Sequence, residues 1–405
     1  MVGVKLAFVA VASGILLRDP NATVAQGQSN ATAAPNTTAP ANRSAPAARK
    51  ALEVGKAPRR GGEGQATPAE PVGRARMTLN SRQEPALSFP EYVDGVTTGR
   101  GIWKWNNALE AYERHLASFK QTTVRVGEVG VWSGGSILMW QTVLGPLCHV
   151  FGLDIAEESM KFADGRTTIT IGDQGDPAMW QHFFSTVTPS LEVLVDDGGH
   201  TAPLMMTTTT SVWPHLAPGG VLAIEDIHGA HYLEPFFKPV AEFYGAHASE
   251  VAGVHIYPYL LLVHKSGGAT AVDPTRRPGA SVAPGSHISS MAEIAAAVDN
   301  APPGSLVVLE NAGWGNFLNP QGLAYFFEYF NELHAPTAMY DTPEGCSHTA
   351  DPVCSTKSTN SPMQTKIKGV HILVNKCVIE IPTSEPVIEA VRHGSKWVKY
   401  PTDHY

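Results

Sequence analysis

Short apolar segments that end in acidic residues recur through the middle of the chain, and helical patterns lie between them. Each apolar segment has the length and residue types of a buried strand. The predicted strands are 124–129, 148–153, 169–171, 191–195 and 221–224, and residues 255–264 are expected to hold the final strands of the sheet. The predicted helices are 103–119, 136–144, 179–184 and 203–216. Strands that alternate with helices form a mostly parallel sheet with helices on both faces, so we predict an α/β domain over residues 86–266.

A glycine-rich turn, GEVGVWSGGS at 127–136, follows the first of these strands. Glycines let the backbone approach a ligand closely, and the N-terminus of the next helix presents free N–H groups. The spacing differs from G-x-G-x-x-G, so a dinucleotide is not the first choice. Glu128 at the strand end can instead receive a cationic aminoacyl group, with Gly130, Ser133 and Gly134 beside it. The alternative for this motif alone is a tight connection without a ligand.

Polar side chains also follow the next three strands. Asp154 can accept both hydroxyls of a ribose, while Asp173 and Gln174 can read the edge of an adenine. Asp196 closes the fourth strand. Ligands of open α/β sheets bind at the carboxyl ends of the strands, so these side chains should converge on one cofactor. A single aspartate at a strand end is explained by a role as a helix cap or turn former. Acids at the ends of successive strands favour a binding site instead.

A second group of acids follows the fourth and fifth strands, in DDGGH at 196–200 and IEDIH at 224–228. Asp197, Glu225 and Asp226 are hard oxygen ligands suited to Mg²⁺ or a similar divalent cation. Without a cation, so many carboxylates would repel one another. His200 can serve as general base, because the ordinary pKa of histidine lies near neutral pH. The alternative is that His200 only caps the following helix.

These motifs, taken as an ordered set, resemble a known family. The quoted segments are GIWKWNNALEAYERHLA (101–117), GEVGVWSGGS (127–136), FGLDI (151–155), IGDQGD (171–176), LVDDGGH (194–200) and PHLAPGGVLAIEDIHG (214–229). They are similar to class I methyltransferases related to the macrolide-sugar and rhamnosyl O-methyltransferases and to the cephalosporin-hydroxylase-like group. The resemblance covers less than half of the chain.

The resemblance implies a Rossmann-like fold and an O-methyltransferase that uses S-adenosylmethionine and Mg²⁺ or a similar cation. The acceptor would be a hydroxyl group of a sugar or glycoconjugate. The implied S-adenosylmethionine contacts are Glu128, Gly130, Asp154, Asp173 and Gln174. The implied metal ligands are Asp197, Glu225 and Asp226, with His200 as the base. If the helices and strands are placed correctly, the acceptor lies among Trp103, Trp105, His228, His231 and Tyr232.

Two other functions are compatible with parts of the pattern. His200, Asp197 and Glu225 would make the facial triad of an iron-dependent oxygenase, but this leaves the acids of the first three strands without a role. A secreted or tethered binding protein on the same fold is the non-enzymatic alternative. The net charge of −8 argues against a nucleic-acid partner, and a homo-oligomer is compatible with the sequence.

The first residues suggest export. Lys5 precedes an apolar run at 6–17, so residues 1–20 are predicted to be a signal peptide or short anchor. The Ala/Pro/Thr-rich residues 21–85 are predicted to be disordered and carry N-glycosylation sequons at Asn21, Asn30, Asn36 and Asn42. These features predict a glycoprotein of the secretory pathway, in the Golgi lumen or secreted, with no membrane span beyond the first apolar segment. Import into a plastid or other organelle is the alternative, because the leader is poor in acids.

The C-terminal part is predicted to be a linker (267–285) followed by a small α/β segment (286–405). Helices are expected at 291–298 and 322–334, and strands at 305–309 and 370–381. PGGVLAIED at 218–226 is similar to PGSLVVLEN at 303–311, and GVHI occurs at both 253–256 and 369–372. This segment is therefore either a partial duplication of the end of the first domain or a coincidence between apolar strands. Cys346 and Cys354 either form a disulfide or remain free thiols.

Overall fold

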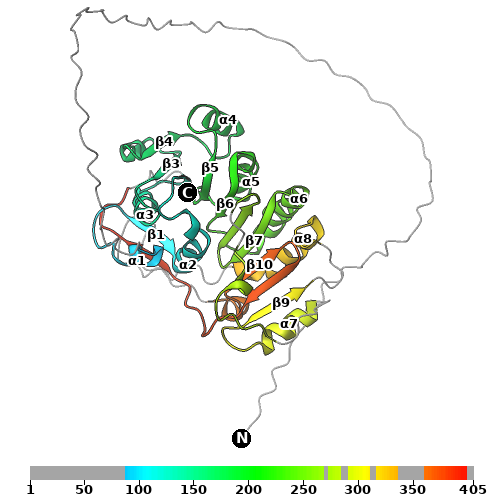
Figure 1. Cartoon of the computed structure of the whole chain (residues 1–405). Helices are drawn as coiled ribbons and strands as arrows, with labels where there is room; N and C mark the ends of the chain where they lie inside the picture. The colour runs from blue at the N-terminus through cyan, green and yellow to red at the C-terminus, as the bar shows by residue number, and fades with distance from the viewer. Residues whose placement is uncertain (1–86, 269–271, 284–290, 311–315, 336–359, 399–405) are drawn as a thin grey trace, which may run out of the picture. The chain divides into compact units, whose positions relative to one another are not determined.

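The computed structural model describes residues 87–268, 272–283, 291–310, 316–335 and 360–398 (Figure 1). Their main feature is a ten-stranded sheet with the order β4-β3-β2-β5-β6-β8-β7-β10-β11-β9. Its strands are β2 Val124–Val129, β3 Cys148–Asp154, β4 Thr167–Ile171, β5 Leu191–Asp196, β6 Leu216–Ile224, β7 Val251–Tyr257, β8 Leu260–Lys265, β9 Leu306–Glu310, β10 Gly369–Leu373 and β11 Lys376–Glu380. The helices are α1 Phe89–Asp94, α2 Asn106–His115, α3 Gly135–Val143, α4 Pro177–Thr186, α5 Ala202–Val212, α6 Lys238–Ala246, α7 Met291–Asn300, α8 Pro320–Tyr329 and α9 Pro362–Lys366.

The first half of the sheet is parallel. Strands β4, β3, β2, β5 and β6 pair in the same direction, and β8 then joins β6 antiparallel. Side chains alternate between the two faces: Val193 and Val195 of β5 pack with α2 and α3, while Leu194 packs with the helices of the other face. The predicted Rossmann-like α/β fold is confirmed, and the carboxyl ends of the parallel strands meet at one edge.

The C-terminal strands continue the same sheet. Strand β10 pairs antiparallel with β7, and β11 and β9 follow it (Figure 1). In this pairing His371 lies opposite His255, and its two neighbours lie opposite the neighbours of His255. The two GVHI segments are thus related by a local two-fold axis between these histidines. On each side a strand, a helix and a hairpin follow one another, and α6 packs against α8. This arrangement favours the partial duplication.

Two predicted elements differ in detail from the structure. The helix expected at 103–119 begins only at Asn106, because residues 102–105 form β1 (Ile102–Trp105), which pairs with β12 (Ala390–His393). The aromatic and β-branched side chains of β1 favour a strand once a partner is present. The strand expected at 370–381 is the β10–β11 hairpin, which turns at residues 374–375.

Several predictions fall outside the described residues. The predicted signal peptide, disordered tail and glycosylation sites lie within 1–86, and Cys346 and Cys354 are also outside the described ranges. Cys148 and Cys377 are buried free thiols. None of the helices in the described ranges is long and apolar enough to cross a bilayer. Location in the secretory pathway therefore stays a prediction.

Candidate functional site

The glycine-rich turn after β2 touches the turn after β5. Gly130 has a φ of +85°, and a Cβ atom added there would lie 1.9 Å from the carbonyl oxygen of Asp197. Gly134, the N-cap of α3, has a φ of 70°, and a Cβ there would lie 2.9 Å from the ring of Phe162. Both positions require glycine, because the backbone is left-handed and the space is already filled. The two turns therefore form one packed edge.

Replacing Gly130 by alanine is expected to lower the free energy of unfolding by at least roughly 2 kcal/mol, because left-handed strain and overpacking add. Gly165→Ala is the matched control, since nothing lies within 4 Å of a Cβ added there. Chemical denaturation of both variants measures the difference. Equal stability of the two variants would contradict the close approach of the two turns.

Glu128 lies at the end of β2 and is fully buried. Its Oε1 accepts a hydrogen bond of 3.1 Å from the indole of Trp140, and Oε2 has no hydrogen-bond partner among the described residues. Burial raises the pKa of Glu128 to about 7 despite the positive charge of Lys104. Ser133 in the same turn accepts a hydrogen bond from the backbone of Val398. The roles of Glu128 and Ser133 as cofactor contacts stay predictions.

Asp154 and Asp173 each hold a turn. Asp154 accepts backbone hydrogen bonds from Trp132 at 2.9 Å and from Ala156 at 2.8 Å, and so ties the glycine-rich turn to the end of β3. Asp173 accepts one from Gly175 at 2.7 Å. A carboxylate oxygen has two lone pairs, so the bond from Gly175 leaves Asp173 capacity for a ligand group. Contacts to a ribose and an adenine stay predictions.

Gln174 connects the end of β4 to the end of β5. Its Nε2 donates to both oxygens of Asp196, at 3.0 and 3.1 Å, and to the hydroxyl of Thr208 at 3.2 Å. Its Oε1 accepts from the backbone of Gly199 at 2.7 Å. The amide thus holds the turn that carries DDGGH. Asp196 is buried, and this burial raises its pKa.

Asp197, His200 and Asp226 form the cluster at the ends of β5 and β6. Each offers a ligand atom, and these atoms lie within 4.8 Å of one another. His200 and Asp226 have positive φ angles of 48° and 56°. Non-glycine residues held in this region carry strain, which concentrates at functional sites. The structure therefore brings the predicted base and two predicted metal ligands to one place.

Asp226 is held by several groups. The indole of Trp105 donates to Oδ1 at 2.6 Å, His228 lies 3.2 Å from the same atom, and His200 lies 3.6 Å from Oδ2. Burial by itself would raise the pKa of Asp226, but the His228 hydrogen bond and the neighbouring histidine charges lower it. Asp226 is therefore an anion at neutral pH.

Lys104 and Tyr112 belong to this site although the sequence did not predict them. The buried Lys104 Nζ contacts Asp197 and lies 2.9 Å from Glu225 Oε1, which also accepts a 2.5 Å hydrogen bond from Tyr112. Burial would lower the pKa of Lys104, but the charges of Asp197 and Glu225 outweigh it and raise the pKa. Burial raises the pKa of Asp197 and of Glu225 to about 7. The sequence feature that could have revealed Lys104 is its place between two tryptophans in an apolar segment.

The residues present fit a divalent cation. One ammonium group, that of Lys104, faces the carboxyl groups of Glu128, Asp197 and Glu225, and Asp226 adds a further carboxylate beside Asp197, so negative charge is left uncompensated. The side chains of Asp197, His200 and Asp226 are 20%, 31% and 26% exposed, whereas that of Glu225 is 2% exposed and faces Lys104. Asp197 and Asp226 are therefore the accessible oxygen donors. The metal role of Glu225 stays a prediction.

Of the residues expected around the acceptor, Trp105, His228 and Tyr232 contact the cluster, and the acceptor role of all of them stays a prediction. The ring of Trp105 lies 4.6 Å from that of Tyr259, while Trp103 packs 6.1 Å from Trp132. The hydroxyl of Tyr232 donates to the carbonyl of His200. The ring of His231 lies 4.3 Å from that of Tyr232, at a tilt of 37°. Tyr232 thereby stabilises the unusual backbone of the predicted base.

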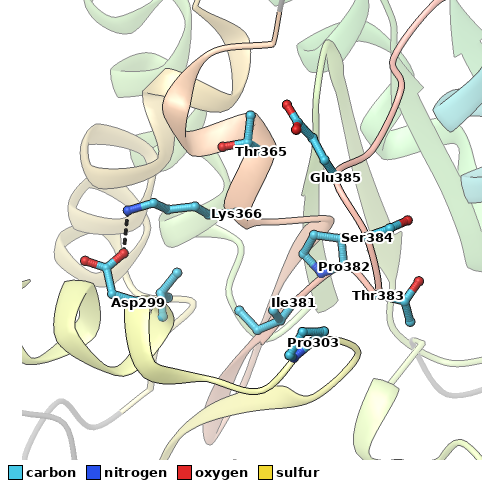
Figure 2. A pocket seen from close by; sticks show the side chains of 10 residues that line it. Asp299, Pro303, Thr365, Lys366, Ile381, Pro382, Thr383, Ser384 and Glu385 are labelled. Carbon is cyan, nitrogen blue, oxygen red and sulfur yellow. Dashed lines mark hydrogen bonds and ion pairs between the residues drawn. The ribbon is translucent and has the colours of Figure 1, made fainter. Parts of the chain in front are cut away.

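A separate surface pocket of about 300 Å³ lies in the C-terminal part (Figure 2). It is lined by Val298, Asp299, Pro303, Thr365, Lys366 and residues 381–385. Lys366 and Asp299 form an ion pair across it, drawn as the dashed line in Figure 2. None of the predicted site residues lines this pocket, so it is distinct from the cluster at the strand ends.

Residues 128–227, which hold both turns and all the acids of the cluster, match the family model described as a methyltransferase domain. These residues are therefore similar to methyltransferase domains. The 8-demethyl-8-alpha-L-rhamnosyl tetracenomycin-C 2'-O-methyltransferase of Streptomyces olivaceus is 29% identical over 170 residues, which are 40% of this chain and 43% of that protein. Demethylmacrocin O-methyltransferase of Streptomyces fradiae is 32% identical over 131 residues, 30% of this chain and 32% of that protein.

The chain therefore spans less than half the length of these curated relatives. Among solved structures, the MycE methyltransferase from the mycinamycin biosynthetic pathway, in complex with Mg and SAH, is 24% identical to this chain. The match covers 41% of this chain and 52% of the MycE chain, with a TM-score of 0.36. The family resemblance predicted from the motifs is confirmed by the domain match and the curated relatives.

Proposed function

We propose that the chain is an S-adenosylmethionine-dependent O-methyltransferase that acts on a hydroxyl group of a sugar or glycoconjugate with the help of a divalent cation. The observation that carries the proposal is the cluster of Asp197, His200 and Asp226 within the methyltransferase domain, directly beside the turn at Gly130. The sugar acceptor follows from the names of the relatives, which are O-methyltransferases of rhamnosyl and macrolide compounds.

Each group has a proposed task. Glu128, Asp154, Asp173 and Gln174, with the turn at Gly130, Ser133 and Gly134, would hold the methyl donor, and Asp196 would support the turn after β5. Asp197 and Asp226, together with the predicted ligand Glu225, would hold Mg²⁺. When bound, the cation would polarise the acceptor hydroxyl group and make its proton easier to remove.

His200 is the proposed general base. Asp226 lies 3.6 Å from His200 Nε2 and stabilises the imidazolium that forms when His200 accepts the hydroxyl proton. The acceptor oxygen then bonds to the methyl carbon of the donor as the carbon–sulfur bond breaks. The electron pair of that bond stays on sulfur, so the sulfonium becomes a neutral thioether. Lys104 holds Asp197 and Glu225 in place throughout.

Methyl transfer from labelled S-adenosylmethionine to a panel of rhamnosides and other glycosides tests the proposal. We expect label in a glycoside product when Mg²⁺ is present, loss of that label in EDTA, and recovery when Mg²⁺ is returned. Transfer that is unaffected by EDTA would show that a divalent cation takes no part in the reaction. Absence of transfer to every glycoside would contradict the proposed acceptor class.

A further inference from the structure

A second cluster of chemistry-bearing side chains lies in the core, away from the acids. Helix α2 supplies His115, β7 supplies His255, β8 supplies His264 and β10 supplies His371. Their exposed fractions are 3%, 0%, 5% and 0%. Four histidines buried together are unusual for a core, because each brings two polar nitrogen atoms that need partners.

The nitrogen atoms of this cluster face one another. His255 Nδ1 lies 2.8 Å from His371 Nδ1, and His115 Nδ1 lies 2.8 Å from His264 Nε2. Tyr257 contacts His115 Nε2 at 2.8 Å. His255 Nε2 has no hydrogen-bond partner within the described part of the chain. Buried polar atoms are rarely left this way, so the unpartnered nitrogen points to a missing ligand.

The electrostatics keep these imidazoles neutral. Burial lowers the pKa values of His115, His255 and His371, and their mutual repulsion contributes to the shift of the first two. Arg114 adds positive charge beside them, and Glu380 lies 3.5 Å from His371 Nε2. Neutral imidazole is the form that binds metal ions.

We propose that His115, His255 and His371 hold a buried divalent transition-metal ion, zinc in the first place, that has a structural role. One nitrogen from each of them lies within 4.8 Å of those from the other two. Ligand nitrogens at the usual zinc distance of roughly 2.0–2.1 Å stand about 3.4 Å apart in a tetrahedral site, so small ring movements close the site. His264 and Tyr257, each 2.8 Å from His115, are the neighbours placed to complete it.

The position of the three histidines indicates which segments of the chain the ion would hold together. His255 and His371 lie on the local two-fold axis where β7 meets β10, so the ion joins the methyltransferase sheet to the C-terminal strands. His115 adds α2, which one turn earlier carries Tyr112, the hydrogen-bond donor to Glu225. Imidazole ligands favour zinc and its neighbours, whereas the carboxylates at the strand ends favour Mg²⁺. The two sites are therefore chemically distinct.

Metal analysis of the full chain, produced with zinc in the medium and dialysed against metal-free buffer, tests this proposal. We expect about one zinc per chain in the wild type, a nearly complete loss in His371→Gln, and no loss in Asp226→Asn, which alters only the acidic cluster. Zinc retained in full by a folded His371→Gln variant would overturn the proposal. A folded wild type that contains no zinc and gains no thermal stability from added zinc would also overturn it.

If His371→Gln does not fold, X-ray absorption of the zinc-loaded wild type decides the question. A shell of three or more imidazole nitrogens supports the histidine site, because the acidic cluster can supply only the imidazole of His200. A shell with fewer than three imidazole nitrogens places the ion elsewhere and overturns the proposal. Neither readout depends on methyl transfer, so the outcome is independent of the proposed function.

Discussion

Lys104→Met is expected to lower the free energy of unfolding by about 3–5 kcal/mol, measured by chemical denaturation in EDTA at pH 8. Lys104 Nζ is buried between Asp197 and Glu225, and the variant leaves these carboxylates without their counter-charge. Removing one partner of a buried ion pair costs this much because the remaining charge is neither solvated nor paired. Methionine keeps the volume of the side chain, so packing changes little.

The loss should depend on pH in a defined direction. In the folded chain the pKa values of Asp197 and Glu225 are about 7, above their ordinary values of about 4. Folding therefore takes up protons, and stability falls as the pH rises from about 4 through 7. Without Lys104 the two pKa values rise further. The deficit of the variant should then be small at pH 5, where the acids are protonated, and largest at pH 8.

Lys238→Met is the matched control for this experiment. Lys238 forms an exposed ion pair with Glu234, its side chain being 47% exposed, and such pairs contribute roughly 0–1 kcal/mol. The control should stay within that range at both pH values. A Lys104→Met variant as stable as Lys238→Met at pH 8 would contradict the buried ion-pair network.

His200→Asn is expected to reduce the rate of methyl transfer by roughly 10²–10⁴-fold, the usual contribution of a general base. Asparagine is chosen because His200 has a φ of 48°, and asparagine tolerates this left-handed backbone better than alanine. The stability of the fold should therefore change little. The rate at saturating acceptor and donor is the quantity to compare.

His200 could act as the base or as a metal ligand, because it also lies within reach of a cation bound by Asp197 and Asp226. The same variant separates these two roles. If His200 acts as the base, the Mg²⁺ concentration that gives half of the maximal rate should stay close to the wild-type value. His182→Asn, on the outer side of α4, is the control and should keep full activity. A rate within tenfold of wild type for His200→Asn would remove His200 as the base.

The parallel half of the sheet and the acids at its edge could be predicted because the information is local. Each strand is a short apolar run, and Asp154, Asp196 and Glu225 follow such runs directly. Parallel topology then brings the strand ends together without further information. The same reasoning predicted Asp197, His200 and Asp226 in one place, and the structure places them together.

What could not be predicted depends on pairing between distant segments. Residues 102–105 have helical spacing with the residues after them, and only their partner strand Ala390–His393 makes them a strand. That pairing places Lys104 in the acid cluster. The histidine cluster likewise required the antiparallel register of His255 against His371, although the repeated GVHI was visible in the sequence. Long-range register leaves no local signature that a pattern of residues reveals.

Calorimetric titration of S-adenosylmethionine into the full chain tests the central claim most directly. We expect saturable binding in the wild type, retained in Gly165→Ala and lost in Gly130→Ala, where the added Cβ displaces the backbone of Asp197. A folded wild type that shows neither heat of binding nor a thermal shift with this donor would contradict the assignment of the strand-end site to methyl transfer.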